Sequence, residues 1–215
     1  MSDLRVVIWR HGQTDWNIQS RFQGHSDIPL NRVGEYQANH AANILAGMNP
    51  VRIISSDLIR AKQTAAPLLE LTKIKLEVDS NLRETNGGNW EGKTESENLA
   101  EDAENFRAWL TGKDIKAGAI GESRKDVAVR ARAAVESAIS EASGTIIFVT
   151  HGGTARCLLG SFLELPYDNW ASLGGLSNAC WSVLEPKSHG WTLVEHNAGS
   201  IPEPVFGVEI GRAHV

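Results

Sequence analysis

Short apolar runs alternate along the chain with longer stretches that carry apolar residues at helical spacing. Continuous apolar runs are typical of buried strands, which we expect at residues 6–9, 51–54, 76–78, 145–150, 179–184 and 191–195. The helical pattern predicts helices over residues 34–47, 57–71, 94–110, 123–139 and 153–165. Asp57 is expected to cap the second helix, and Ser123 with Asp126 forms a capping box. Alternating strands and helices predict an α/β fold, with helices on both faces of a mostly parallel sheet.

Basic side chains follow several of the predicted strands. Arg10 and His11 end the first strand, Arg60 follows the second, and His151 ends the strand at 145–150. Because ligands of such sheets bind beyond the carboxyl ends of the strands, these side chains are expected to gather at one edge.

Each histidine alone also fits a core residue, a metal ligand or an ordinary loop residue. However, a strand followed by His-Gly occurs twice, at His11-Gly12 and His151-Gly152. Glycine lets the backbone approach a bound group closely, and the helix expected after His151 points free N–H groups at an anion. The neighbouring arginines repel a divalent cation but bind phosphate, so the pattern favours a phosphate site over a metal site.

Glu84 lies in a loop rich in glycine and asparagine after the third predicted strand. A surface glutamate is the ordinary interpretation, just as a solvated surface arginine is for Arg60. In a pocket, Glu84 would instead supply the proton that a departing alkoxide needs.

Composition narrows the class of protein. The chain has 215 residues and a formal net charge of −5, which argues against nucleic acid as the main partner. No apolar run reaches transmembrane length and no secretory signal is recognised, so we expect a cytoplasmic protein without a membrane partner. Cys157 and Cys180 lack metal-ligand spacing and are expected to be buried thiols.

Several motifs together resemble a known family. Residues 7–17 (VIWRHGQTDWN) resemble the RHG signature of the histidine phosphatase superfamily, in its phosphoglycerate mutase-like branch. Further matching blocks follow in the family's order at residues 21–24, 29–31, 55–61, 82–84, 88–92, 121–123 and 149–153. The resemblance implies a three-layer αβα sandwich, in which residues 1–215 form one histidine phosphatase domain with a helical cap insertion at about 86–121 and an irregular tail from about 199.

The same resemblance implies a catalytic mechanism. His11 would attack phosphorus and form a phosphohistidine, with Glu84 as acid and then as base. The phosphoryl oxygens would be held by Arg10, Arg60, His151 and Asn17. Substrate contacts are also expected at Gln23, Gly24 and Gly152. No metal and no cofactor is implied.

The cap insertion is short, which favours a phosphatase over a mutase, because a mutase must keep water away from its phosphoenzyme. The resemblance points to a phosphorylated sugar or glycerate compound as substrate. A phosphoglycerate mutase, or a broad-specificity acid or sugar phosphatase, is the alternative. A non-catalytic binding module is disfavoured because every expected catalytic residue is present. The family also suggests a homodimer.

The tryptophans allow two interpretations. Trp9 and Trp181 are expected in the core. Trp16, Trp90 and Trp109 either line a sugar-sized pocket or pack in the protein interior.

Overall fold

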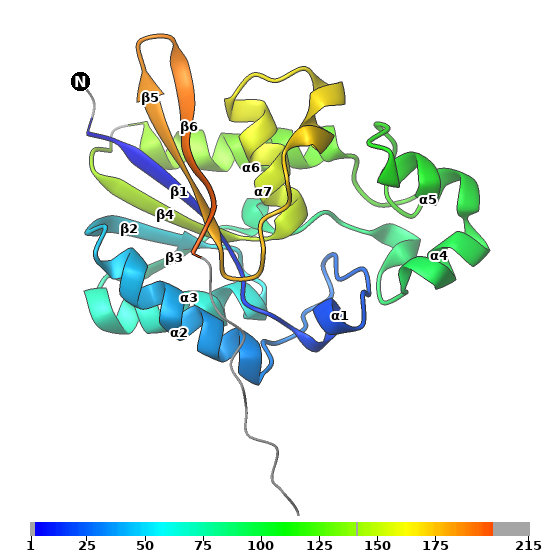
Figure 1. The fold of residues 1–215 in the computed structure, drawn as a ribbon, viewed down its shortest axis with the longest axis horizontal. Helices are drawn as coiled ribbons and strands as arrows, with labels where there is room; N and C mark the ends of the chain where they lie inside the picture. The colour runs from blue at the N-terminus through cyan, green and yellow to red at the C-terminus, as the bar shows by residue number, and fades with distance from the viewer. Residues whose placement is uncertain (1–2, 141, 200–215) are drawn as a thin grey trace, which may run out of the picture.

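Six strands form one sheet in the computed structural model, which describes residues 3–140 and 142–199 (Figure 1). The strands are β1 (Arg5–Arg10), β2 (Pro50–Ser55), β3 (Leu76–Val78), β4 (Thr145–Thr150), β5 (Trp181–Lys187) and β6 (Gly190–Ala198). Their order across the sheet is β3-β2-β4-β1-β5-β6. The first four in this order pair in parallel, whereas β5 is antiparallel to β1, and β6 to β5. The predicted α/β fold with a mostly parallel sheet is confirmed.

Helices cover both faces of the sheet. In Figure 1, α2 (Arg32–Ala46) and α3 (Ile59–Thr72) lie below it, and α6 (Arg124–Ile139) and α7 (Gly152–Phe162) lie above it. The remaining helical segments are α1 (Asp15–Ile18), α4 (Glu95–Glu101), α5 (Ala103–Leu110) and the 3-10 turns η1 (Ser80–Leu82), η2 (Gly88–Trp90) and η3 (Tyr167–Ser172).

Strand β1 shows why the central strands are apolar on both faces. Val7 and Trp9 belong to the core cluster that includes residues of α2 and α3, whereas Val6 and Ile8 belong to the cluster that includes residues of α6 and α7. All four are fully buried, and each such side chain contributes about 1.5–3 kcal/mol to stability. Trp9 and Trp181 are core residues, as predicted.

The cap of α3 differs from the prediction. The N-cap residue is Leu58, and the Asp57 carboxylate instead accepts two hydrogen bonds from Arg83, at 2.7 Å from Nε and 2.5 Å from Nη2. Asp27, from a distant loop, accepts from the backbone N–H of Ile59 at 2.6 Å. The prediction that Asp57 caps α3 is therefore wrong, because a paired arginine outcompetes the local backbone donor.

The helix predicted over residues 94–110 is interrupted. It forms α4 and α5, separated by Asp102 with φ −144° and ψ 54°. The Asp102 carboxylate accepts from Trp90 Nε1 at 3.2 Å and from Asn105 Nδ2 at 2.8 Å. This tertiary contact holds Asp102 outside helical geometry, which local propensity does not reveal.

The loop expected over residues 10–30 contains a short helix, α1. Thr14 caps it through a capping box with Asn17, in which each side chain bonds to the other residue's backbone N–H. A four-residue helix is too short to produce an apolar period, so the sequence pattern missed it.

Residues 86–121 contain η2, α4 and α5, which lie to the side of the sheet (Figure 1). They have a small apolar cluster of their own, formed by Trp90, Phe106, Trp109 and Ala117. Beyond Gly199, the expected irregular tail lies outside the described residues. Cys157 and Cys180 are buried free thiols, as predicted. Within the described ranges, no helix has the length and apolarity to cross a bilayer.

Candidate active site

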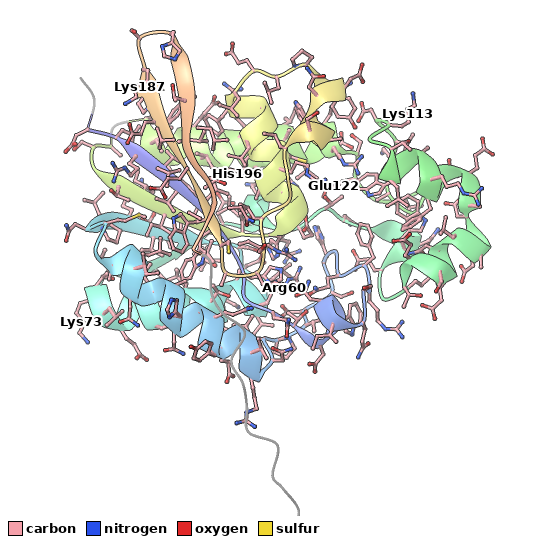
Figure 2. All side chains as sticks on the ribbon, in the orientation of Figure 1. Arg60, Lys73, Lys113, Glu122, Lys187 and His196 are labelled. Carbon is pink, nitrogen blue, oxygen red and sulfur yellow. The ribbon has the colours of Figure 1, made fainter. Side chains whose placement is uncertain are left out.

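The carboxyl ends of β1, β2 and β4 meet beside α1, and a cavity of about 250 Å³ opens there. Figure 2 shows Arg60 at this end of the sheet. Most of the predicted site residues line the cavity, namely Arg10, His11, Asn17, Gln23, Gly24, Arg60 and Glu84. His151 and Gly152 do not line it, and Gly153 of the same helix does.

His11 is held in one protonation state. Its Nδ1 lies 2.7 Å from the carbonyl oxygen of Gly12, and because a carbonyl only accepts, Nδ1 carries the proton. Nε2 therefore keeps its lone pair. Burial lowers the pKa of His11 well below its ordinary value, and the charges of Arg60 and Arg10 lower it further. A neutral imidazole with a free Nε2 is the form that a nucleophilic histidine requires.

Gly12, whose carbonyl accepts the hydrogen bond from His11 Nδ1, is itself fixed by its neighbours. Its N–H donates to Thr64 Oγ1 at 3.0 Å, and a Cβ at this position would lie 2.5 Å from the carbonyl oxygen of Gly34. Any side chain here would push α2 away from the strand end, so glycine is required for close packing.

Arg60 is fully buried and is held on three sides. Its Nε donates to His151 Nδ1 at 3.1 Å, and its two terminal nitrogens donate to the carbonyl oxygens of Ser26 and Gly24 at 2.7 and 2.8 Å. Burial lowers the pKa of Arg60 to about 10, so the side chain remains charged at neutral pH. This geometry presents a fixed positive charge close to His11.

Arg10 provides the second positive charge. Its Nη1 donates to the Leu176 carbonyl at 2.5 Å, and burial lowers its pKa from the ordinary value. Its Nε is buried, and no residue in the described part of the chain accepts a hydrogen bond from it. A buried donor without an acceptor is costly, and a phosphoryl oxygen in the cavity would relieve that cost.

His151 has both ring nitrogens occupied. Its Nδ1 accepts from Arg60, so Nε2 carries the proton and donates to Ser56 Oγ at 2.9 Å. Burial lowers the pKa of His151 well below its ordinary value, and Arg60 and His11 lower it further. Its ring centroid lies 5.2 Å from that of His11. His151 thus contacts Arg60 but is not part of the cavity lining, and its direct contact with phosphoryl oxygens stays a prediction.

The Glu84 carboxylate is oriented by the start of α7. Its Oε2 accepts from the N–H of Gly153 at 2.9 Å, and its Oε1 accepts from those of Thr154 and Thr85 at 3.0 and 2.8 Å. A Cβ on Gly153 would lie 2.5 Å from Glu84 Oε1, so this glycine is needed where the prediction named only its neighbour Gly152.

The backbone of Glu84 is fixed as well. Its carbonyl oxygen accepts from Arg130 Nη2 and from His25 Nε2, both at 2.9 Å. Arg130 also pairs with Glu122, at 2.7 Å between Nε and Oε1, and Figure 2 shows Glu122 between α7 and α5. The Glu84 backbone is therefore held by Arg130 of α6 and by His25, which are far apart in sequence.

The other predicted substrate contacts have different surroundings. Asn17 Oδ1 accepts from the Thr14 N–H at 3.0 Å, and no described residue accepts from its amide nitrogen. Gln23 Oε1 is buried without a donor in the described residues. Gly24 has φ +48° and uses its carbonyl to hold Arg60. Their binding roles stay predictions.

Sequence reasoning missed part of the cavity wall. Phe22, Arg21, Arg124 and Arg156 also line it. The position of Arg156, about one turn after His151, allows it to face either substrate or solvent, so the sequence alone gives it no role, whereas the structure places it in the lining. Of the three tryptophans considered for a pocket, Trp109 lines the cavity, Trp90 packs in the interior, and Trp16 lies outside the lining.

The cavity is rich in guanidinium groups and poor in metal ligands. Within the residues that the structure describes, no group of three or more histidine, cysteine, aspartate or glutamate side chains could hold a metal ion. Burial raises the pKa of the Cys157 thiol to about 12, so this cavity residue is neither a thiolate ligand nor a nucleophile.

The model of the histidine phosphatase superfamily (branch 1) matches residues 6–199 of the chain. The chain belongs to the histidine phosphatase superfamily. It is 40% identical over 193 residues to a glucosyl-3-phosphoglycerate phosphatase of Mycobacterium tuberculosis, covering 86% of each chain. It is 38% identical over 172 residues to a probable phosphoglycerate mutase GpmB of Shigella boydii, covering 79% of this chain and 78% of the relative.

Solved structures show the same fold. A mycobacterial glucosyl-3-phosphoglycerate phosphatase in complex with VO3 superposes with a TM-score of 0.85 and 40% identity. The match covers 91% of this histidine phosphatase and 99% of the other chain. The family resemblance seen in the sequence motifs is thereby confirmed.

The two buried histidines make a testable contribution to stability. Both have a lowered pKa in the folded protein, whereas in the unfolded chain they titrate near their ordinary value of about 6.5. Below that pH the unfolded state binds more protons, so the free energy of unfolding should fall as pH falls, by up to about 1.4 kcal/mol per pH unit for each histidine.

Urea denaturation between pH 7.5 and 5, in buffer without phosphate, measures this slope. His11→Asn should remove about half of the histidine contribution, whereas replacing the exposed His189 by alanine should leave the slope unchanged. Equal slopes for the wild type and His11→Asn would contradict the assignment of a neutral His11.

Proposed function

We propose that this histidine phosphatase hydrolyses glucosyl-3-phosphoglycerate through a phosphohistidine formed on His11. One observation carries the chemistry: the neutral His11, with Nε2 unprotonated, lies close to the buried Arg60 and the half-buried Arg10 in a cavity that Glu84 also lines. The choice of substrate is supported by the names of the similar proteins, which include glucosyl-3-phosphoglycerate phosphatases of Mycobacterium tuberculosis and Mycolicibacterium vanbaalenii.

In the first step, the Nε2 lone pair of His11 attacks phosphorus, and the bond between phosphorus and the ester oxygen breaks. Glu84 transfers its proton to the departing alkoxide. Arg10 and Arg60 stabilise the negative charge on the equatorial oxygens, which is the main source of acceleration in phosphoryl transfer.

In the second step, water attacks the phosphohistidine, and the Glu84 carboxylate accepts a proton from that water. The phosphorus–nitrogen bond breaks, its electron pair returns to His11, and inorganic phosphate leaves. The enzyme regains its starting protonation state, because the proton that Glu84 gave up in the first step is restored in the second.

Hydrolysis is favoured over mutase chemistry by the way the cavity is covered. Residues 86–121, which we propose act as the cap, contribute a single side chain to the lining, that of Trp109. A site covered so lightly admits water. Water can then hydrolyse the phosphohistidine before the phosphoryl group is transferred to another hydroxyl of the substrate.

The experiment that tests this function is a hydrolysis panel under metal-free conditions. It compares glucosyl-3-phosphoglycerate with mannosyl-3-phosphoglycerate, 3-phosphoglycerate, fructose bisphosphates and an aryl phosphate, and a mutase assay on 3-phosphoglycerate runs beside it. The highest kcat/KM is expected for glucosyl-3-phosphoglycerate. Mutase turnover faster than any hydrolysis would contradict the proposal.

Chelation should leave activity unchanged. Every group in the proposed mechanism belongs to a side chain of the protein, so dialysis against EDTA should change kcat by less than about twofold. The check is the rate before and after dialysis, and again after Mg²⁺, Mn²⁺ or Zn²⁺ is added. Loss of activity with EDTA that a divalent ion restores would contradict the mechanism.

Two further expectations complete the proposal: a cytoplasmic location, which the sequence pattern suggests, and a homodimer, which the family resemblance suggests. Sedimentation of the purified protein tests the dimer.

A further inference from the structure

We propose that Arg124 and Arg156 form a second anion subsite in the same cavity, which binds the carboxylate of the phosphoglycerate unit. This inference rests on the proposed function and adds the residues that select the substrate. The starting observation is charge: the cavity lining holds five arginines and one carboxylate, Glu84, in a chain whose formal net charge is −5.

Three of these arginines already have defined partners. Arg10 and Arg60 hold the phosphate end beside His11, as described above. Arg21 forms an ion pair with Glu97 at 3.3 Å and donates to the carbonyl of Gly92 at 2.6 Å. The charges of Arg124 and Arg156 are therefore more than a single phosphoryl group requires.

Arg156 has no hydrogen-bond or ion-pair partner among the described residues, and its Nε is buried. It lies on α7 about one turn beyond Gly153, whose N–H holds the Glu84 carboxylate. A partly buried guanidinium without a partner is unfavourable unless a ligand supplies the acceptor. Arg156 lines the same cavity as His11 and Glu84, so a ligand in that cavity can reach it.

Arg124 is held in place but still has a donor that can bind an anion. Its Nη2 donates to the carbonyl of Trp109 at 2.8 Å, and its guanidinium lies 3.9 Å from the centroid of the Trp109 ring. Its Nη1 is buried without an acceptor in the described residues. The neighbouring Tyr167 hydroxyl interacts with Arg124, but burial raises the pKa of Tyr167 more than Arg124 lowers it, so the hydroxyl stays neutral and does not balance the charge.

The chemistry of this pair fits a carboxylate, the second anionic group of the proposed substrate. Guanidinium groups offer planar pairs of N–H donors that match the two oxygens of a carboxylate. In a 3-phosphoglycerate unit, the carboxylate is separated from the phosphate ester by two carbons, so both anions fit within one small cavity. Phe22 and Trp109, which line the same cavity, offer apolar faces for the sugar.

The test uses a matched pair of substrates: glucosyl-3-phosphoglycerate and its analogue in which a hydroxymethyl group replaces the carboxylate. For the wild type, kcat/KM should be higher for the carboxylate compound by about 10- to 100-fold. Arg156→Gln and Arg124→Gln should each reduce this preference by about 10-fold or more, with the loss mainly in KM. Arg156→Lys should keep part of it, because the charge is retained.

Arg107→Gln is the matched control, since it makes the same change in net charge at an exposed position outside the cavity lining. It should keep the full preference. Inhibition by inorganic phosphate, which engages the other end of the cavity, should change by less than about threefold in Arg156→Gln, and this shows that the variant is folded.

A preference that survives both substitutions would overturn the subsite, and so would an equal loss on both substrates. A wild type that hydrolyses both compounds equally would also overturn it, while leaving the phosphatase mechanism in place. Failure of the proposed function looks different: the wild type would then hydrolyse neither glucosyl compound.

Discussion

Replacing His11 by alanine should reduce phosphomonoester hydrolysis by at least about 10⁴-fold, because the substitution removes the side chain proposed to form the covalent intermediate. Cys157 also lines the cavity, but burial raises the pKa of its thiol to about 12, which keeps it protonated. Arg10 and Arg60 would still bind phosphate, so the loss should appear in kcat much more than in the affinity for inorganic phosphate.

The measurement combines steady-state rates with trapping of the intermediate. Rapid acid-free quenching of the wild type with a ³²P-labelled substrate should give an acid-labile label on the peptide that contains His11. His189→Ala, in the exposed turn between β5 and β6, serves as the control and should keep full activity and labelling. Near wild-type turnover by His11→Ala would show that the nucleophile is another group.

Replacing Glu84 by glutamine should slow the hydrolysis of alkyl phosphates by about 10²- to 10⁴-fold, since an alkoxide needs a proton to leave. An aryl phosphate has a leaving group that departs without protonation. Its first step should be nearly normal, and only the second step, which needs Glu84 as base, should be slow. The variant should therefore release one equivalent of phenol in a burst and accumulate phosphohistidine.

Stopped-flow absorbance with an aryl phosphate measures that burst. Glu91→Gln is a close control: the Glu91 carboxylate also accepts several backbone N–H bonds, from His25, Ser26 and Gly87, but it lies outside the cavity lining. The Glu91→Gln variant measures how much activity is lost when an amide replaces a carboxylate that accepts backbone N–H bonds. It should show no burst. Equal slowing of alkyl and aryl substrates by Glu84→Gln, without a burst, would remove Glu84 as the general acid.

The sequence by itself determined the fold class and the residue types of the site. Continuous apolar runs such as residues 6–9 demanded strands buried on both faces, and the alternation with helices demanded a mainly parallel sheet. The rule that ligands bind beyond the strand ends then brought together Arg10, His11 and Arg60. These conclusions rest on local periodicity and on the order of strands and helices, both of which can be read from a single sequence.

Only the tertiary structure decided how these groups act. The proton positions of His11 and His151 depend on the Gly12 carbonyl and on Arg60, and the break at Asp102 depends on Trp90. Three further features have the same origin: the hydrogen bond from the Ile59 N–H to Asp27, the place of Trp109 in the cavity lining, and the lack of a partner for the buried Arg156 Nε among the described residues. The contact between His11 and the adjacent Gly12 depends on a backbone conformation that packs against Gly34. The others depend on partners distant in sequence or on which face of an element is enclosed, and side-chain spacing along the chain does not encode those contacts.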